Sequence, residues 1–148
     1  FTDDLTEEQF CRGLSKMSND KACGPDGIPA ELYKRVPICK KLLYTLLLKI
    51  WHTEEVPVEF ARATFVMLYK NKGSTNDPSK YRCIGLLTHA YKVLSQILLE
   101  RLERETKGFL SDWQAGFRKQ RGCRDNVLTL HSTCDELLCR GDKLYHVY

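Results

Sequence analysis

The feature that most constrains the fold of this chain is a change in the spacing of its apolar residues. In the first 60 residues, apolar side chains recur every three or four positions, which is the spacing of amphipathic helices. Over residues 61–69 they alternate instead, as in a half-buried β-strand. A polar loop over 71–79 and a second strand over 81–87 would complete a hairpin, after which helical spacing returns. The pattern predicts a mostly helical α/β (α+β) fold with one short β-hairpin.

Helices are expected over 6–17, 29–35, 38–52, 88–107 and 124–138. Thr6 and Gln9 have the spacing of a capping box, and Thr88 suits the cap of the fourth helix. The residues expected to point into the core are Phe10, Leu14, Met17, Leu42, Leu43, Leu46, Leu47, Ile50, Tyr91, Leu94, Leu98 and Leu102. A final strand is expected over 144–148.

The chain has 148 residues, of which 43% are hydrophobic and 28% charged, so it is long enough for one domain with a real core. Its longest apolar run, over 42–48, is too short to span a bilayer, and no signal peptide is visible. Seven cysteines without a CxxC pair favour reduced thiols and an intracellular location. The grouping of His131, Cys134 and Cys139 lacks the spacing of a zinc site, so no metal site is predicted.

Charge is distributed unevenly along the chain. Residues 62–124 contain 13 Lys and Arg against 5 Asp and Glu, a net charge of +8, whereas the remainder carries 10 against 14, or −4. A basic stretch of this size indicates a partner that carries phosphates. On charge alone, a solvated surface explains the stretch equally well.

Three segments, in order along the chain, resemble the motifs of one enzyme family. They are residues 21–29 (KACGPDGIP), 81–87 (YRCIGLL) and 114–122 (QAGFRKQRG). They are similar to the N-terminal half of the reverse transcriptase of non-LTR (LINE-type) retrotransposons, whose consensus runs roughly KAPGPDGI, YRPISLL and QAGFRKGR. The linking segments are similar too, so the resemblance extends from about Thr6 to Tyr148. One segment alone is a weak signal, whereas three in the family's order are a strong one.

The resemblance implies that residues 1–148 are a partial reverse transcriptase domain, comprising the fingers and the start of the palm of a right-hand polymerase. In that family a hairpin of the fingers lays basic side chains over the triphosphate of the incoming deoxynucleotide, where fixed cations stabilise the charge of phosphoryl transfer. By the resemblance, Arg82 is the first candidate for this contact, because its forked guanidinium suits phosphate oxygens. Lys70 and Lys72 are the next. Pairing of Arg82 with an acid across the hairpin, or a solvated loop tip at the lysines, would explain them without a ligand.

The third segment is expected to contact the RNA template. An aromatic side chain among basic residues can hold a strand by stacking and phosphate contact, and a glycine lets the backbone approach closely. Alternatively, the aromatic ring is buried and the cations form a solvated rim. In the first segment, a template contact competes with an ordinary turn. The template-binding candidates are Gly116, Phe117, Arg118, Lys119, Arg121, Asp26 and Gly27.

The sequence departs from the family consensus at four positions. Cys23 and Cys83 stand in place of prolines, which loosens a turn and the start of a strand that proline would preset. Gly85 replaces a serine. Gln120 replaces a glycine, which matters only if that position requires a positive φ angle.

The family's first catalytic aspartate follows a strand that residues 143–148 (KLYHVY) resemble, and it would lie about two residues beyond Tyr148. The opening FTDD has the aromatic–x–Asp–Asp pattern of the family's second carboxylate box, but no strand precedes it. The capping box that follows predicts that Asp3 and Asp4 lie just before a helix or within its first turn rather than bind metal. Two-metal catalysis requires carboxylates to hold both ions, so no catalytic or metal-binding residue is expected within these 148 residues. Polymerisation by this chain alone is not expected either.

By the resemblance, the parent activity is RNA-directed DNA synthesis from deoxynucleoside triphosphates with Mg²⁺ held in the missing palm. The expected partners are an RNA template, a DNA primer, the nucleotide, and the palm and thumb of the same polymerase, with no membrane among them. Two other functional classes remain open. One is a non-enzymatic nucleic-acid-binding module, and the other is an inert remnant of a decayed element.

Overall fold

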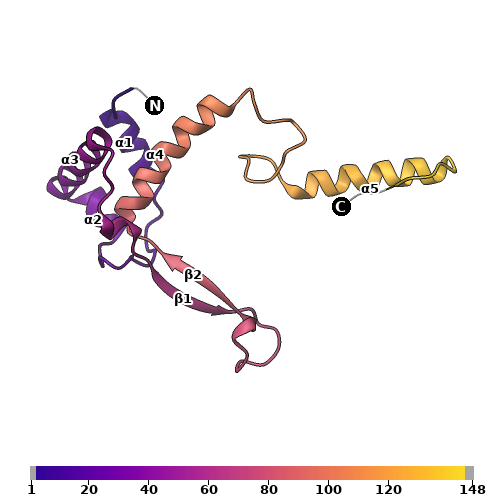
Figure 1. Cartoon of the computed structure of the whole chain (residues 1–148), viewed down its shortest axis with the longest axis horizontal. Coiled ribbons are helices and arrows are strands. Elements are labelled where there is room, and N and C mark those ends of the chain that lie inside the picture. Colours follow the sequence, from indigo (N-terminus) through magenta and orange to yellow (C-terminus); the bar gives the residue numbers. More distant parts are fainter. Residues whose placement is uncertain (1–2, 146–148) are drawn as a thin grey trace. The chain divides into compact units, whose positions relative to one another are not determined.

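The computed structural model describes residues 3–145. The fold is mixed α/β and about half helical, with a two-stranded antiparallel hairpin, which confirms the predicted class at this level (Figure 1). The chain divides into two compact units, Phe1–Glu103 and Arg104–Tyr148. In chain order the elements are α1 (Glu7–Ser15), α2 (Ala30–Arg35), α3 (Pro37–Thr53), the 3-10 turn η1 (Val58–Ala61), β1 (Thr64–Tyr69), the 3-10 turn η2 (Pro78–Lys80), β2 (Tyr81–Leu86), α4 (His89–Thr106) and α5 (Cys123–Cys139).

The core of the first unit lies among α1, α2, α3 and α4. Its most deeply buried large side chains are Phe10, Leu47, Val93 and Ile97. Phe10 also packs its ring against Tyr44, with 5.1 Å between centroids. These helices form because each contributes one apolar stripe, and burial of those stripes against one another supplies most of their stability.

Local sequence signals fixed several helix ends as predicted. Thr6 and Gln9 form the expected capping box, in which the Gln9 amide donates to the Thr6 hydroxyl at 3.2 Å and the Gln9 side chain accepts from the Thr6 amide. The Thr88 hydroxyl accepts a hydrogen bond from the Tyr91 amide at the start of α4. Pro37 occupies the first turn of α3, which therefore begins one residue before the start predicted at Ile38. Side chains adjacent in sequence supply these bonds, so sequence spacing alone was enough to predict them.

The predicted buried stripes were only partly right. On α3, Leu43, Leu47 and Ile50 are buried, whereas Leu42 is 63% exposed and Leu46 37% exposed. On α4, Leu98 and Leu102 are 39% and 50% exposed. The buried face of α4 instead includes Ile97 and the charged Arg101. A helix that is apolar on several sides does not reveal which side faces the core, and a buried arginine hides the true stripe from a hydrophobic pattern.

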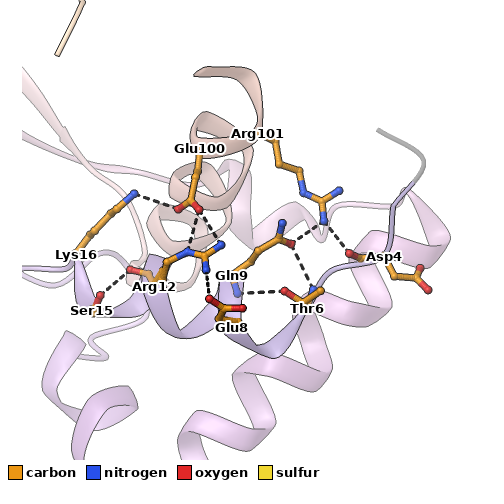
Figure 2. A network of polar contacts seen from close by, with 9 residues as sticks. All are labelled: Asp4, Thr6, Glu8, Gln9, Arg12, Ser15, Lys16, Glu100 and Arg101. Atoms are coloured by element: carbon orange, nitrogen blue, oxygen red, sulfur yellow. Dashed lines mark hydrogen bonds and ion pairs between the residues drawn. The ribbon is translucent and has the colours of Figure 1, made fainter. Parts of the chain in front are cut away.

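Arg101 holds the segment before α1 in place (Figure 2). Its guanidinium donates to the carbonyl oxygens of Asp3 and Asp4 and to the side-chain oxygen of Gln9, each at 2.7 Å. It also lies over the ring of Trp51, 4.4 Å from the centroid. Arg101 is 5% exposed, so these acceptors and the ring replace the water that its charge loses on folding.

A second polar contact joins α1 to α4 in the same view (Figure 2). Arg12 and Lys16 form ion pairs with Glu100 at 2.9 and 3.2 Å, and Arg12 also pairs with Glu8. Burial raises the pKa of the Glu100 carboxyl, but the hydrogen bonds from the two cations outweigh it and leave the pKa below its usual value. Gly13 lies beside this contact, where a Cβ would meet Ile97 at 3.1 Å, so α1 and α4 approach closely.

The hairpin pairs β1 with β2 in the register Thr64 to Leu86 through Tyr69 to Tyr81. We predicted that its first strand would be half-buried, and this was wrong: Phe65 is 68% exposed and Leu68 48% exposed, so both faces are open. Alternation shows that two faces differ, but burial needs another layer to cover one of them. The strands stay together through their ladder and through side-chain pairs such as Tyr69 with Tyr81, whose centroids are 5.4 Å apart.

In the second unit, α5 confirms the helix predicted there, and it has no buried residue. The final strand is not seen where it can be assessed: Leu144 and Tyr145 lie outside any strand, and residues 146–148 fall outside the described residues. Across residues 3–145, none of the helices combines the length and apolar character that crossing a bilayer requires.

Candidate functional site

Three cations, Lys70, Lys80 and Arg82, lie toward the turn end of the hairpin. In the antiparallel register Arg82 lies opposite Leu68, and residues that face each other across a ladder share a side. The amide of Lys70 donates to the carbonyl of Lys80 at 2.8 Å, so the pairing continues past the strand ends. Lys70 lies two positions after Leu68, so the period of two places it on the side of Arg82, whereas Lys80 belongs to the 3-10 turn η2.

These cations differ in how far the protein already engages them. The Lys70 ammonium donates to the carbonyl of Ser79 at 2.8 Å, an acceptor that leaves its charge uncompensated. Lys80 pairs with Asp77 at 3.7 Å. The amide of Ser79 also donates to the Asp77 carboxylate, and hydrogen bonds from Ser79 lower the pKa of Asp77. The side chain of Arg82 is exposed, and no hydrogen bond or ion pair engages its guanidinium within residues 3–145. The alternative in which Arg82 pairs with an acid across the hairpin is thus not seen.

Lys72 lies in the turn itself and is exposed. The turn bends through Asn71 and Gly73, whose φ angles are 55° and 89°. Hydroxyl groups fasten this turn to the strands, because Tyr69 donates to the carbonyl of Gly73 and Tyr81 to that of Thr75. Lys72 therefore projects from a turn whose backbone is tied down at several points.

The first segment of the family pattern packs at the other end of β2. A Cβ on Gly24 would lie 2.5 Å from the amide nitrogen of Thr88 and 2.6 Å from the carbonyl carbon of Leu87, so only glycine fits. The sequence pattern of this stretch left a turn and a template contact open and did not show this constraint, because the backbone that excludes a side chain is far away in sequence. Gly27 has a φ of 65°, and the Asp26 carboxylate accepts from the amide of Ile28 at 3.2 Å, as in an Asx turn.

Asp26 and Gly27 do not join the cations near the hairpin turn. Leu87 follows Arg82 by five positions, which is about 17 Å at the usual rise of a strand. The first segment therefore lies at the base of the hairpin, and the candidate phosphate contacts lie near its turn. His89 is buried beside this base, and neither ring nitrogen has a hydrogen-bond partner within the described chain.

The third segment forms two successive turns in the second unit. The amide of Arg118 donates to the carbonyl of Ala115, and the amide of Arg121 donates to that of Arg118, each at 3.3 Å. The third residue of each turn is left-handed: Phe117 has a φ of 58° and Gln120 a φ of 60°. Turns of this kind favour glycine there. The position where the family consensus has glycine and this chain has Gln120 thus does require a positive φ.

Phe117 is fully exposed, with a relative exposure of 113%. The alternative in which its ring is part of a core is therefore wrong for the described residues. Gly116, by contrast, has no positive φ, and a Cβ there would meet nothing within 4 Å. The close backbone approach predicted at Gly116 is not needed within the chain itself.

The two arginines of the third segment are engaged within their own loop. Arg118 donates to the carbonyl of Ser111 at 2.6 Å, and Arg121 donates to the carbonyl of Asp112 at 3.0 Å and to its carboxylate at 2.7 Å. Lys119 is exposed and has no such contact within residues 3–145. The predicted template residues therefore belong to two groups, which the sequence pattern did not separate.

Across residues 3–145, no three His, Cys, Asp or Glu side chains gather where they could hold a metal ion. Asp3 and Asp4 use their backbone carbonyls to bind Arg101, and the carboxylate of Asp4 lies 3.4 Å from His52. Comparison with models of known protein families finds none that matches the chain. The functional assignment therefore depends on the sequence segments and on the geometry of these side chains.

Proposed function

We propose that this chain is the fingers part of a reverse transcriptase of the non-LTR (LINE-type) retrotransposons. In this role the hairpin contacts the triphosphate of an incoming deoxynucleotide through Arg82, Lys70 and Lys72. The loop of the second unit contacts the RNA template, with Asp26 and Gly27 as further template contacts. The observation that supports the proposal most is the exposed, unengaged guanidinium of Arg82 with Lys70 beside it.

The chemistry of this group of cations suits a triphosphate. Diagonal same-side neighbours on paired strands lie about 7 to 8 Å apart, which lets Arg82 and Lys70 contact one chain of phosphates, and Lys72 lies in the adjoining turn. The forked guanidinium of Arg82 can bind two oxygens at once, and the ammonium groups act as point charges. The chain's residues would bind and orient the nucleotide. In the proposed parent enzyme, Mg²⁺ and its carboxylates come from the palm, and the described residues hold no cluster of that kind.

Binding of a deoxynucleoside triphosphate to the purified chain tests this role. At low salt, we expect Arg82→Ala to weaken binding by about five- to tenfold, because a charged hydrogen bond contributes on the order of 1.5 kcal/mol. Arg62→Ala is the matched control, since Arg62 is exposed at the other end of the hairpin and removes the same charge. Equal weakening by both variants, or by neither, would contradict the assignment of the site to Arg82.

A second function, a nucleic-acid-binding module without catalysis, is favoured by the exposed ring of Phe117 beside Lys119. Filter binding to single-stranded RNA at two salt concentrations tests it. Affinity that falls steeply with salt supports the module, since phosphate contacts release counterions. If RNA binds and triphosphate does not, the module replaces the polymerase proposal. If neither binds at low salt, both proposals fail and an inert remnant is left.

A further inference from the structure

The basic side chains of the loop over residues 111–122, in the second unit, differ in how they are engaged. We infer that Arg118 and Arg121 are positioning residues that hold this loop in shape, and that Phe117 and Lys119 contact the nucleic acid. The inference rests on the proposed template-binding function and names its ligand more narrowly. The ligand is a single nucleic-acid strand with at least one unpaired base. The proposed function implies that this strand is RNA.

Both arginines of this loop are hydrogen-bonded to groups of the same loop. The two arms of the Arg121 guanidinium contact one residue, Asp112, at its carbonyl and at its carboxylate. Arg118 reaches back to Ser111 and, at 3.5 Å, to Gln114. Both contacts join the end of the loop to its beginning. An arginine used in this way has fewer donors left for phosphate.

These bonds maintain a turn in which Phe117 has a left-handed backbone conformation. Phe117 lies at a φ of 58°, which costs an ordinary residue about 1 to 2 kcal/mol. Its ring is fully exposed, so burial of the ring does not offset that cost. Ala115 is the one residue of this loop that is buried. The side-chain bonds made by Arg118 and Arg121 therefore help to hold the strained turn in shape, together with the bond that the Asn126 side chain donates to the carbonyl of Trp113 at 3.0 Å.

Phe117 and Lys119 are the exposed side chains of this loop whose chemistry suits a nucleic acid. A fully exposed aromatic ring presents both faces, and the partner that fits a flat apolar face is another flat ring. Bases of a duplex are already stacked, whereas an unpaired base has a free face. Lys119 follows Phe117 by two positions and is unengaged, so it can contact a phosphate next to a stacked base. Together these side chains fit a single strand.

Binding of a short single-stranded RNA, and of the same RNA with abasic sites in place of its bases, tests the inference. The abasic strand keeps every phosphate and removes the stacking. Phe117→Leu keeps the apolar volume and loses the ring. We expect it to weaken binding to the normal RNA by about fivefold or more and to leave binding to the abasic RNA unchanged.

The decisive variant is Asp112→Ala, which removes an acid and raises the net charge by one. If Asp112 positions the loop through Arg121, binding to normal RNA weakens by about two- to fivefold in spite of the added positive charge. Binding to abasic RNA stays equal or tightens. If Arg121 contacts phosphate directly, freeing it tightens binding to both RNAs, and that result would overturn the inference.

Matched substitutions separate charge from geometry. Arg121→Lys keeps the charge but loses the two-armed contact, so it should behave like Asp112→Ala on normal RNA. Lys119→Gln should lower the slope of log affinity against log salt by about 0.7, the value for one lost phosphate contact on a single strand. A slope lowered by Arg121→Gln as much as by Lys119→Gln would assign a phosphate contact to the arginine and overturn the division of roles.

Hydrogen exchange of the Arg118 and Arg121 amides decides the positioning role without any nucleic acid, because both amides close the turns of the loop. Faster exchange in Asp112→Ala supports positioning, and unchanged exchange overturns it. If the unmodified chain fails to bind RNA, the proposed function fails while this measurement still decides the role of Asp112. Circular dichroism of each variant confirms that the helices are retained, since Asp112 is exposed in a loop.

Discussion

At the scale of single residues, the positions that matter most to this fold are polar groups and glycines in places that a hydrophobic pattern does not mark. Thr88, His89 and Arg101 are polar or charged and are nevertheless buried. Gly24 is required by a backbone contact with Leu87 and Thr88. Substitution at each of these positions should therefore change the free energy of unfolding.

His89 makes stability depend on pH. Burial, followed by repulsion from Lys92, lowers the pKa of His89 below its ordinary value of 6.5, although Asp26 and Glu31 oppose this. Below pH 6.5 the unfolded chain therefore binds more protons at this histidine than the folded chain does. The contribution of His89 to the free energy of unfolding should have its full value above about pH 6.5. It should decrease as the pH falls from there through the lowered pKa of the folded state.

Urea unfolding at a series of pH values between about 5 and 8 measures this dependence. His89→Leu should flatten the curve in that range, because no buried imidazole is left to protonate. His131→Ala is the control, since His131 is exposed on α5 and pairs only with Asp135 at 2.9 Å. An unaltered slope in His89→Leu would show that another group causes the dependence.

Gly24→Ala tests the contact at the base of the hairpin. The added Cβ would meet backbone atoms at 2.5 to 2.8 Å, and backbone cannot move aside as a flexible side chain can. We expect the free energy of unfolding to fall by about 1 to 3 kcal/mol, the usual cost of overpacking. Gly108→Ala, where a Cβ meets nothing within 4 Å, should change it little. Thermal or urea unfolding of both variants provides the comparison.

At the scale of elements, polar contacts join segments that are far apart in the sequence. The start of the chain is joined to α4 by Arg101, and α1 is joined to α4 by Glu100. In the second unit, the turns around Phe117 and Gln120 depend on bonds within one loop. These contacts hold α1 and the segment before it against α4, whereas local caps such as Thr6 and Thr88 set where the helices begin.

Arg101→Ala should loosen the N-terminal segment and lower stability by about 2 to 4 kcal/mol, because three acceptors lose a charged donor in a buried place. Arg101→Lys should recover little, since one ammonium cannot reproduce the fork. Arg104→Ala on the exposed side of α4 is the control and should change stability by less than about 0.5 kcal/mol. Urea unfolding measures all three, and equal effects at Arg101 and Arg104 would contradict this role.

Gln120→Gly tests the strained turn directly. Glycine adopts a φ of 60° without steric cost, so the turn should become more stable by about 0.5 to 1 kcal/mol. The amide of Arg121, which closes this turn, should then exchange more slowly with solvent. Lys119→Gly has no positive φ to relieve and should speed the same exchange. Faster exchange in Gln120→Gly would show that the turn is not strained there.

At the scale of the whole chain, the two units differ in how much they bury. The first unit contains the helical core, whereas α5 in the second has no buried residue and exposes Val127, Leu128 and Leu138 at about two thirds each. Because helices are stabilised mainly by packing of an apolar face, α5 depends on its own hydrogen bonds.

Hydrogen exchange along the full chain should show this difference. Amides in the middle of α3 and α4 should exchange only through global unfolding, and those of α5 should be protected by no more than about 1 to 2 kcal/mol. The comparison is internal, since α3 and α5 each have 17 residues. Protection in α5 equal to that in α3 would mean that a partner surface covers it in solution.

By itself, the sequence determined where the helices and the hairpin lie, which residues cap them, and that the middle of the chain is basic. These properties depend on neighbours within a few positions, so periodicity and turn chemistry contain them. The tertiary structure decided which sides of α3 and α4 face the core, why Gly24 cannot bear a side chain, and that the hairpin is open on both faces. It also decided that Arg82 and Lys119 are unengaged while Arg118 and Arg121 are used within their loop. Those outcomes depend on which groups meet after folding, and a local pattern of residue types does not specify such partners.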